Sequence, residues 1–149
     1  MRAIVQRVTN ADVSVGGNIT GQIAGGLVVL LGVEDSDTAA DALYMAEKVA
    51  GLRIFDDSEG KMNLSVIDKG GAVLAVSQFT LLGDARKGKR PSFIKAARPD
   101  KANELYKQFV NAVKKHGPHV EEGIFQAEML VRINNDGPVT IMLDSKKMF

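Results

Sequence analysis

Residues 72–82, AVLAVSQFTLL, decide the fold because they place polar side chains directly after an apolar strand. The first five residues form an unbroken apolar run, too short for a helix and rich in valine, which predicts a strand buried on both faces. Ser77, Gln78 and Thr80 then arrive together, with Phe79 among them. If the strand continues, Gln78 and Thr80 share one face, and Ser77 and Phe79 share the other.

Polar groups at the end of a buried strand must find hydrogen-bond partners or face a cavity. Two interpretations are therefore open from these residues alone. In the commoner one, the polar side chains are satisfied where the strand runs out. In the other, they form the floor of a ligand pocket. This interpretation starts from the lower expectation, because a protein has few such pockets.

The composition indicates one domain spanning residues 1–149, long enough to bury a real core. The sequence holds 19 Lys and Arg residues and 18 Asp and Glu residues, so its net charge gives no reason to expect a polyanionic partner. Any surface that binds nucleic acid must be a local patch. The absence of cysteine excludes disulfides and thiolate chemistry. The sequence shows no signal-peptide core and no membrane-length apolar run, so we expect a cytoplasmic protein that does not enter a membrane.

The pattern along the chain predicts an α+β domain, with an antiparallel β-barrel-like or sandwich sheet and two helices packed on one side. Helices are expected at residues 38–50 and 100–116, the second with Tyr106 on its apolar face. Residues 127–134 and 139–144 predict a final hairpin closed by residues 135–138. The other expected strands are residues 2–8, 13–15, 18–23, 27–33 and 52–55. A glycine turn is expected to join 13–15 to 18–23 as a hairpin. Residues 62–67 are compatible with either a strand or a loop.

Most catalytic side-chain sets are missing from the sequence. It holds no G-x-S-x-G elbow, no phosphate-binding loop and no dinucleotide fingerprint. His116 and His119 are spaced as in a surface turn rather than a metal site, and we expect no metal and no cofactor. Asp56, Asp57 and Glu59 fall on a turn, where solvation is the expected role. An enzyme of this sequence lacks an evident base, so its bond is already labile or its substrate supplies a catalytic group.

A basic run lies in residues 83–91, GDARKGKRP. Such a run is usually a solvated loop, but it could also contact phosphates, and each contact would make binding salt-dependent. The basic side chains concerned are Arg86, Lys87, Lys89 and Arg90.

Gly137-Pro138 is the second unusual feature, at the tip of the expected hairpin. The preceding Asp136 makes a strong turn signal with Gly137. An ordinary turn explains the pair, but it also exposes bare carbonyl groups with no side chain in the way.

These motifs together resemble those of the D-aminoacyl-tRNA deacylase family. SQFTL and the Gly-Pro pair are the specific combination, and this chain departs from the family pattern in neither. The resemblance runs end to end and includes MRAIVQRV at the start, LRIF at 52–55, GKMN at 60–63, SQFTL at 77–81, KGKRPSF at 87–93 and NNDGPVT at 134–140.

The resemblance implies an antiparallel, barrel-like homodimer with its pocket at the subunit interface. The family proofreads translation: it hydrolyses the ester between a D-amino acid and the terminal adenosine of tRNA, and it also acts on glycyl-tRNA, including glycine mischarged on tRNA(Ala). Gly137 and Pro138, joined by a cis bond, would enter the partner's pocket, hold the amino group with backbone oxygens and leave no room for an L side chain. Arg7 would brace this tip.

The resemblance also assigns the remaining pocket residues. The backbone N–H groups of Phe79 and Thr80 would be the oxyanion donors. The catalytic lining would comprise Ser77, Gln78, Phe79 and Thr80, and the wall would be completed by Pro91, Ser92 and Phe93.

The resemblance also suggests how a site without a base could work. An aminoacyl ester carries a ribose hydroxyl beside the scissile bond, so we expect RNA-assisted catalysis in which the protein orients and stabilises. Thr80 as a nucleophile is the competing mechanism, although no base neighbours it in the sequence. The competing function is a non-catalytic small tRNA-binding dimer that uses residues 86–90, and the third option is a purely structural dimer.

Overall fold

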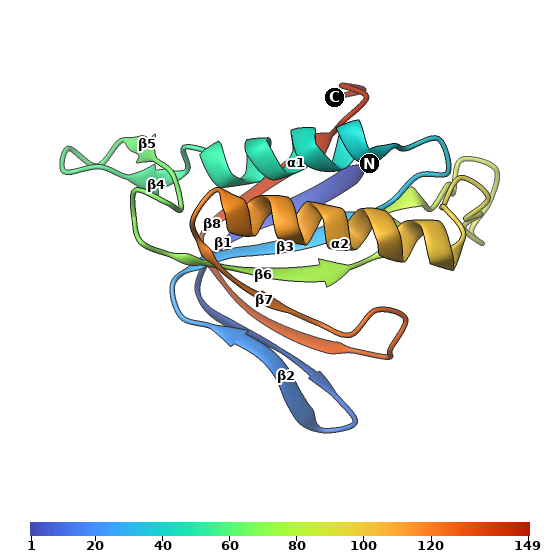
Figure 1. Cartoon of the computed structure of the whole chain (residues 1–149), viewed down its shortest axis with the longest axis horizontal. Coiled ribbons are helices and arrows are strands. Elements are labelled where there is room, and N and C mark those ends of the chain that lie inside the picture. The colour runs from blue at the N-terminus through green and yellow to red at the C-terminus, as the bar shows by residue number, and fades with distance from the viewer.

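A curved six-stranded sheet carries both helices on one of its faces (Figure 1). The computed structural model describes residues 1–149, the whole chain. The strand order is β2-β1-β3-β6-β7, and β8 pairs with β1. The elements are β1 (Arg2–Val15), β2 (Asn18–Ile23), β3 (Gly26–Gly32), α1 (Ala39–Gly51), β4 (Phe55–Asp56), β5 (Met62–Leu64), β6 (Ala72–Ser77), η1 (Phe79–Leu82), α2 (Pro99–Lys115), β7 (His119–Glu122) and β8 (Leu130–Asp144).

Two parallel strand pairs lie at one end of the sheet, which is otherwise antiparallel. β6 lies between β3 and β7 and runs parallel to both. Parallel neighbours need a long crossover connection, and α1 and α2 lie in those two connections. The expected α+β class, with a barrel-like sheet and both helices on one side, is confirmed, while the sheet is mixed rather than wholly antiparallel.

Strand β6 is buried on both faces, as its apolar run predicts. Val73 and Ala75 belong to the larger core between the sheet and the two helices, which contains 26 buried residues. Leu74 and Val76 point the other way, into a cluster of seven buried residues inside the curl of the sheet. Because both faces are covered, a purely apolar strand is the stable choice at this position.

The N-terminal strand is longer than expected. Residues 2–8 and 13–15 belong to one strand, β1, because β8 pairs with it along almost its full length. The first half of β1 also pairs with β3 and the second half with β2. The turn into β2 uses Gly16 and Gly17 at φ +56° and +82°, so the predicted glycine hairpin is confirmed.

The expected final hairpin is wrong. Residues 130–144 form the single strand β8, which keeps β1 as its partner on both sides of the Gly-Pro pair. The pairing passes from Val8 with Asn135 to Gln6 with Thr140, so residues 136–139 bulge out opposite Arg7. The turn signal therefore marks a bulge that leaves the strand direction unchanged.

The small pair β4 and β5 stands apart from the main sheet. The sequence left residues 62–67 open between strand and loop, and in the structure only residues 62–64 form a strand.

Strand β7 was not expected from the sequence. Neither helix is long and apolar enough to cross a membrane.

Candidate active site

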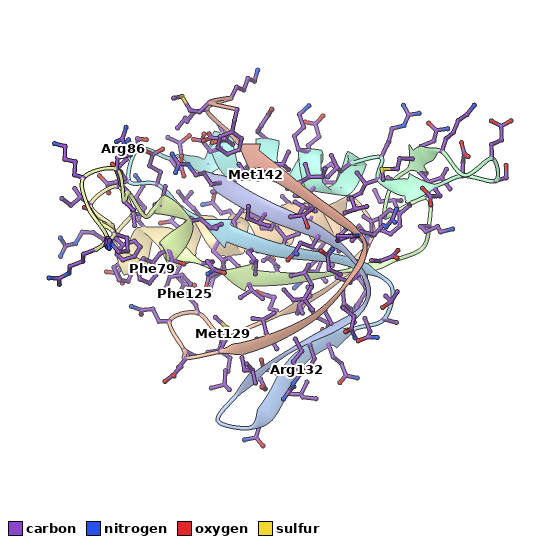
Figure 2. The ribbon with its side chains drawn as sticks, turned by 180° about the vertical axis from the view of Figure 1, so that it is seen from behind. Phe79, Arg86, Phe125, Met129, Arg132 and Met142 are labelled. Carbon is purple, nitrogen blue, oxygen red and sulfur yellow. The ribbon has the colours of Figure 1, made fainter.

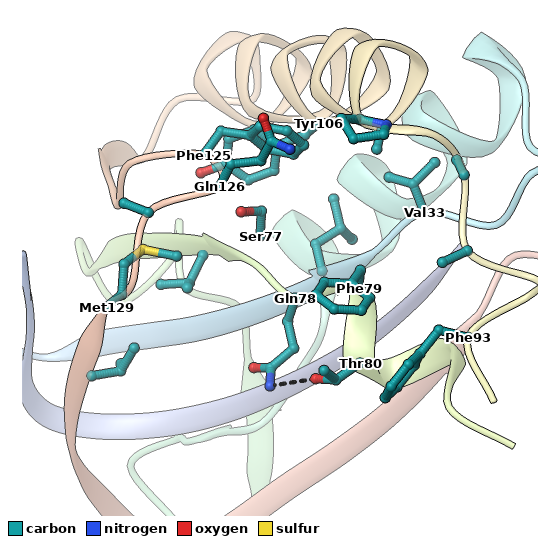
Figure 3. Close-up of a pocket in the computed structure, with 18 residues that line it drawn as sticks. Val33, Ser77, Gln78, Phe79, Thr80, Phe93, Tyr106, Phe125, Gln126 and Met129 are labelled. Carbon is teal, nitrogen blue, oxygen red and sulfur yellow. Dashed lines mark hydrogen bonds between the residues drawn. The ribbon is translucent and has the colours of Figure 1, made fainter. Parts of the chain in front are cut away.

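The polar stretch after β6 leaves the strand instead of continuing it. Strand β6 ends at Ser77, and the backbone N–H of Gln78 donates to the carbonyl of Leu31 on β3 at 2.7 Å. The chain then winds into η1, a 3-10 helix that begins at Phe79. The side-chain amide of Gln78 donates to the hydroxyl of Thr80 at 2.9 Å, as the dashed line in Figure 3 shows.

A cavity of about 740 Å³ opens over this stretch (Figure 3). Of the two interpretations open from the sequence, the structure therefore supports the pocket. The cavity lies between the end of β6, the start of α2 and the loop that joins β7 to β8. The expected residues on its lining are Ser77, Gln78, Phe79, Thr80 and Phe93.

Aromatic side chains make up much of the wall. Phe79 and Phe93 meet edge to face with ring centroids 5.1 Å apart. On the opposite side, the ring centroids of Tyr106, on α2, and Phe125 lie 6.2 Å apart. The hydroxyl of Tyr106 donates to the carbonyl of Ala75 at 3.0 Å. Burial, with a contribution from the nearby Glu122 carboxylate, raises the pKa of Tyr106 well above its usual value. A neutral phenol whose proton is already donated to the backbone is a wall residue rather than a base.

The joining loop supplies lining residues that the sequence did not single out. Phe125, Gln126 and Met129 project from it toward the cavity. Gln126 has a φ of +63°, in the left-handed region, and the N–H of Ala127 donates back to the carbonyl of Ile124 at 3.2 Å. This tight turn presents Phe125 against Tyr106. Seen from behind, Phe79, Phe125 and Met129 gather at one side of the curved sheet (Figure 2).

Two backbone N–H groups at the cavity floor are left outside the hydrogen bonds of η1. The turn bonds of η1 begin with the N–H of Leu81, which donates to the carbonyl of Gln78 at 3.3 Å. The first residues of any helix have no acceptor within it. The N–H groups of Phe79 and Thr80 are therefore donors that η1 itself does not use.

The Gly-Pro pair lies away from this cavity in the single chain. The bond between Gly137 and Pro138 is cis, as the resemblance implies, and both residues are exposed. Arg7 is buried beneath the bulge, with Nε 3.0 Å from a carboxylate oxygen of Asp136. Its Nη1 donates to the carbonyl of Ile54 at 2.8 Å, so the guanidinium links the bulge to the chain before β4.

The expected site residues in the loop of residues 83–93 differ in whether they reach the cavity and whether they form ion pairs. Pro91 and Ser92 do not line the cavity, because the backbone of Ser92 pairs with that of Asp84 at the base of the loop. Arg86 is held by the carboxylate of Asp84, with Nε 2.9 Å from Oδ1. The other basic residues of the loop are exposed and form no ion pair: Lys87, Lys89 and Arg90.

Comparison with known proteins places these features in a family. The family described as D-Tyr-tRNA(Tyr) deacylase matches residues 4–144. The chain is 62% identical to the D-aminoacyl-tRNA deacylase of Koribacter versatilis and 59% identical to that of Fervidobacterium nodosum, in each case over 100% of both chains.

Two solved structures are similar to the chain along almost its whole length. One is titled a c-Myc DNA unwinding element binding protein; it is 43% identical, has a TM-score of 0.91, and the match covers 97% of this chain and 98% of that one. A probable eukaryotic D-amino acid tRNA deacylase shares the fold at a TM-score of 0.80 and 19% identity, over 95% and 97% of the two chains. With the family matching nearly the whole length and full-length relatives this similar, the chain belongs to the D-aminoacyl-tRNA deacylases and is a hydrolase of D-aminoacyl-tRNA.

Proposed function

We propose that the cavity over η1 hydrolyses the aminoacyl ester with main-chain groups and with help from the RNA itself, and that the Gly-Pro bulge of a second copy completes the site. The observation that carries the mechanism is the chemistry of the lining. No histidine, carboxylate, lysine or arginine lines the cavity. Its one ionisable side chain, that of Tyr106, donates to the Ala75 carbonyl.

A site without a base needs a substrate that brings its own assistance. The terminal ribose carries a hydroxyl beside the ester, close enough to orient or activate the attacking water. The protein then has to stabilise the oxyanion that forms on the ester carbonyl. The spare N–H groups of Phe79 and Thr80 are suited to that role, and one such donor is worth about 10²–10³ in rate.

The hydroxyl of Thr80 is a poor nucleophile in this arrangement. It accepts a hydrogen bond from the Gln78 amide at 2.9 Å, and no base lies on the cavity wall to take its proton. Water therefore remains the better attacking group.

We assign stereochemical selection to the bulge on β8. Gly137 and Pro138 are exposed and outside their own cavity, so a second copy of the chain is the natural source of contact between bulge and cavity. Their carbonyl groups would accept from the substrate amino group and leave space for a D side chain only. Glycine has no side chain to exclude, so glycyl-tRNA would also be hydrolysed. The protein would act where tRNA is charged, in the cytoplasm.

The experiment that tests this mechanism compares tRNA substrates that differ only in the terminal ribose. D-tyrosyl-tRNA and L-tyrosyl-tRNA would each be prepared with a normal terminal adenosine and with a 2′-deoxyadenosine carrying the 3′ ester. We expect fast release of D-tyrosine from the normal substrate, little from the L-ester, and a rate lower by about 10² or more without the neighbouring hydroxyl. Equal rates with and without that hydroxyl would rule out RNA assistance.

The Thr80→Ala variant separates this mechanism from covalent catalysis. It keeps the backbone N–H and removes the hydroxyl, so we expect substantial deacylation to remain. A variant that binds D-tyrosyl-tRNA normally but shows no turnover would make Thr80 the nucleophile.

A further inference from the structure

The side chain of Asn135 closes the neck of the bulge that carries Gly137 and Pro138. Its Nδ2 donates to the carbonyl of Val139 at 3.1 Å and to the carbonyl of Arg7, on the neighbouring strand β1, at 3.0 Å. Asn135 directly precedes the bulge and Val139 is its last residue, so one amide group ties the two ends of the bulge to each other and to β1.

The oxygen of the same side chain is fully used as well. Asn135 Oδ1 accepts from Gln6 Nε2 at 3.2 Å and from Thr140 Oγ1 at 3.2 Å. The Gln6 amide also lies 3.4 Å from Thr140 Oγ1. A carboxamide offers two N–H donors and two acceptor lone pairs, so all four positions of Asn135 are engaged. A network satisfied in this way favours one arrangement of the backbone it holds.

Arg7 supports the bulge differently. Its guanidinium lies beneath the bulge, 3.0 Å from Asp136 and 3.8 Å from Asp56. These ion pairs involve half-exposed carboxylates and fix the position of Arg7 more than the width of the loop. The Asn135 hydrogen bonds, in contrast, set the separation of the two backbone segments from which Gly137 and Pro138 project.

We propose that Asn135, backed by Gln6 and Thr140, is a positioning residue for stereochemical selection. It contacts no substrate; it holds the neck of the bulge so that the carbonyl groups of Gly137 and Pro138 keep the spacing at which they discriminate D from L. This inference rests on the proposed role of the Gly-Pro bulge in selection.

The test measures kcat/KM for D-tyrosyl-tRNA and L-tyrosyl-tRNA in Asn135→Asp, which keeps the size of the side chain but removes both donors and sets a carboxylate against two carbonyls. We expect the D-to-L ratio of kcat/KM to fall about fivefold or more, the worth of one neutral hydrogen bond or above. Thr140→Val should lower the ratio in the same direction, and Thr140→Ser, which keeps the hydroxyl, should restore it.

The chain offers a matched control next door. Asn134 is exposed, and its amide donates to Asn10 across the same pair of strands without touching the bulge. Asn134→Asp should leave the D-to-L ratio unchanged, while thermal melting of each variant records any general loss of stability. If the Asn135→Asp protein does not fold, the comparison of Thr140→Val with Thr140→Ser tests the proposal instead.

The outcomes separate this inference from the function on which it rests. Unchanged ratios in both Asn135→Asp and Thr140→Val, with Gly137→Ala strongly affected, would overturn the role of Asn135 alone. An unchanged ratio in Gly137→Ala would instead remove the proposed role of the bulge itself.

Discussion

Replacing Gly137 by alanine should damage the discrimination between D- and L-esters more than it damages the fold. Gly137 has a φ of +116°, a region that L residues rarely adopt. A Cβ built there would lie 2.9 Å from the backbone nitrogen of Val139, 2.8 Å from its Cγ2 and 3.1 Å from an Arg7 nitrogen. Positions of this kind cost about 1–3 kcal/mol when a side chain is forced on them.

The bulge can relieve this conflict only by changing its own backbone, because the closest backbone atom, the nitrogen of Val139, is part of the bulge. A displacement approaching 1 Å in a group that positions a reacting molecule can cost about 10² in rate. We therefore expect kcat/KM for D-tyrosyl-tRNA to fall by about tenfold to a hundredfold, with release from the L-ester unchanged or raised.

The assay is single-turnover release of labelled tyrosine from D- and L-tyrosyl-tRNA, with thermal melting measured in parallel. Gly16→Ala is the matched control: its φ is +56°, but a Cβ there meets nothing within 4 Å, and the residue lies in the β1–β2 turn. It should cost some stability and leave the D-to-L ratio intact. A folded Gly137→Ala protein with the wild-type ratio would refute the reasoning.

Three further substitutions test the structure around the site. Tyr106→Phe removes the hydrogen bond to the Ala75 carbonyl and should cost about 1 kcal/mol, or about 2–4 °C of Tm, in a melting experiment; no change in Tm would show that the bond contributes nothing. Burial acts to raise the pKa of Asp41, but hydrogen bonds from Ser145, Thr38 and Lys146 hold it well below the usual value. The Asp41 carboxylate therefore stabilises the fold above pH about 4 and loses that effect on acidification, so urea unfolding should depend less on pH in Asp41→Asn than in wild type. Neutralising Lys87 and Lys89 together should reduce the salt dependence of tRNA binding by about two phosphate contacts, and an unchanged salt slope would place those contacts elsewhere.

The sequence predicts those features of the fold that depend on local pattern. The apolar run before Ser77 requires cover on both faces, and the structure places a core on each side of β6. The polar side chains after it indicate a change of environment, and the cavity lies there. Strand β7 escaped prediction because its four residues, HVEE, include a single apolar side chain.

The remainder of the site depends on contacts that no local pattern contains. Tyr106 falls on the apolar stripe of α2, and nothing in that stripe distinguishes a residue facing a cavity from one in the core. Phe125 lies in a loop whose direction is set by the left-handed Gln126. A non-glycine residue at positive φ has no reliable sequence signal.

The Gly-Pro turn shows the same limit from the other side. Asp136-Gly137 is a sound turn signal, and the backbone does leave the regular strand there to form a bulge. Whether the strand reverses or resumes depends on its partner, and here both arms of β8 pair with β1. The alternation in residues 130–144 is equally compatible with both outcomes, so only the pairing decides.

The central claim is that one copy supplies the cavity and another the Gly-Pro bulge, and mixed dimers test it most directly. Gly137→Ala distorts the bulge, because its Cβ would clash with Val139. Ala127→Trp blocks the cavity, because Ala127 lies on its lining. Each variant alone should keep about a tenth or less of the wild-type activity on D-tyrosyl-tRNA. After unfolding and refolding the two in equal amounts, about a quarter of wild-type activity should return, since half the dimers are mixed and each holds one intact site. Activity that never exceeds the average of the separate variants would contradict the claim.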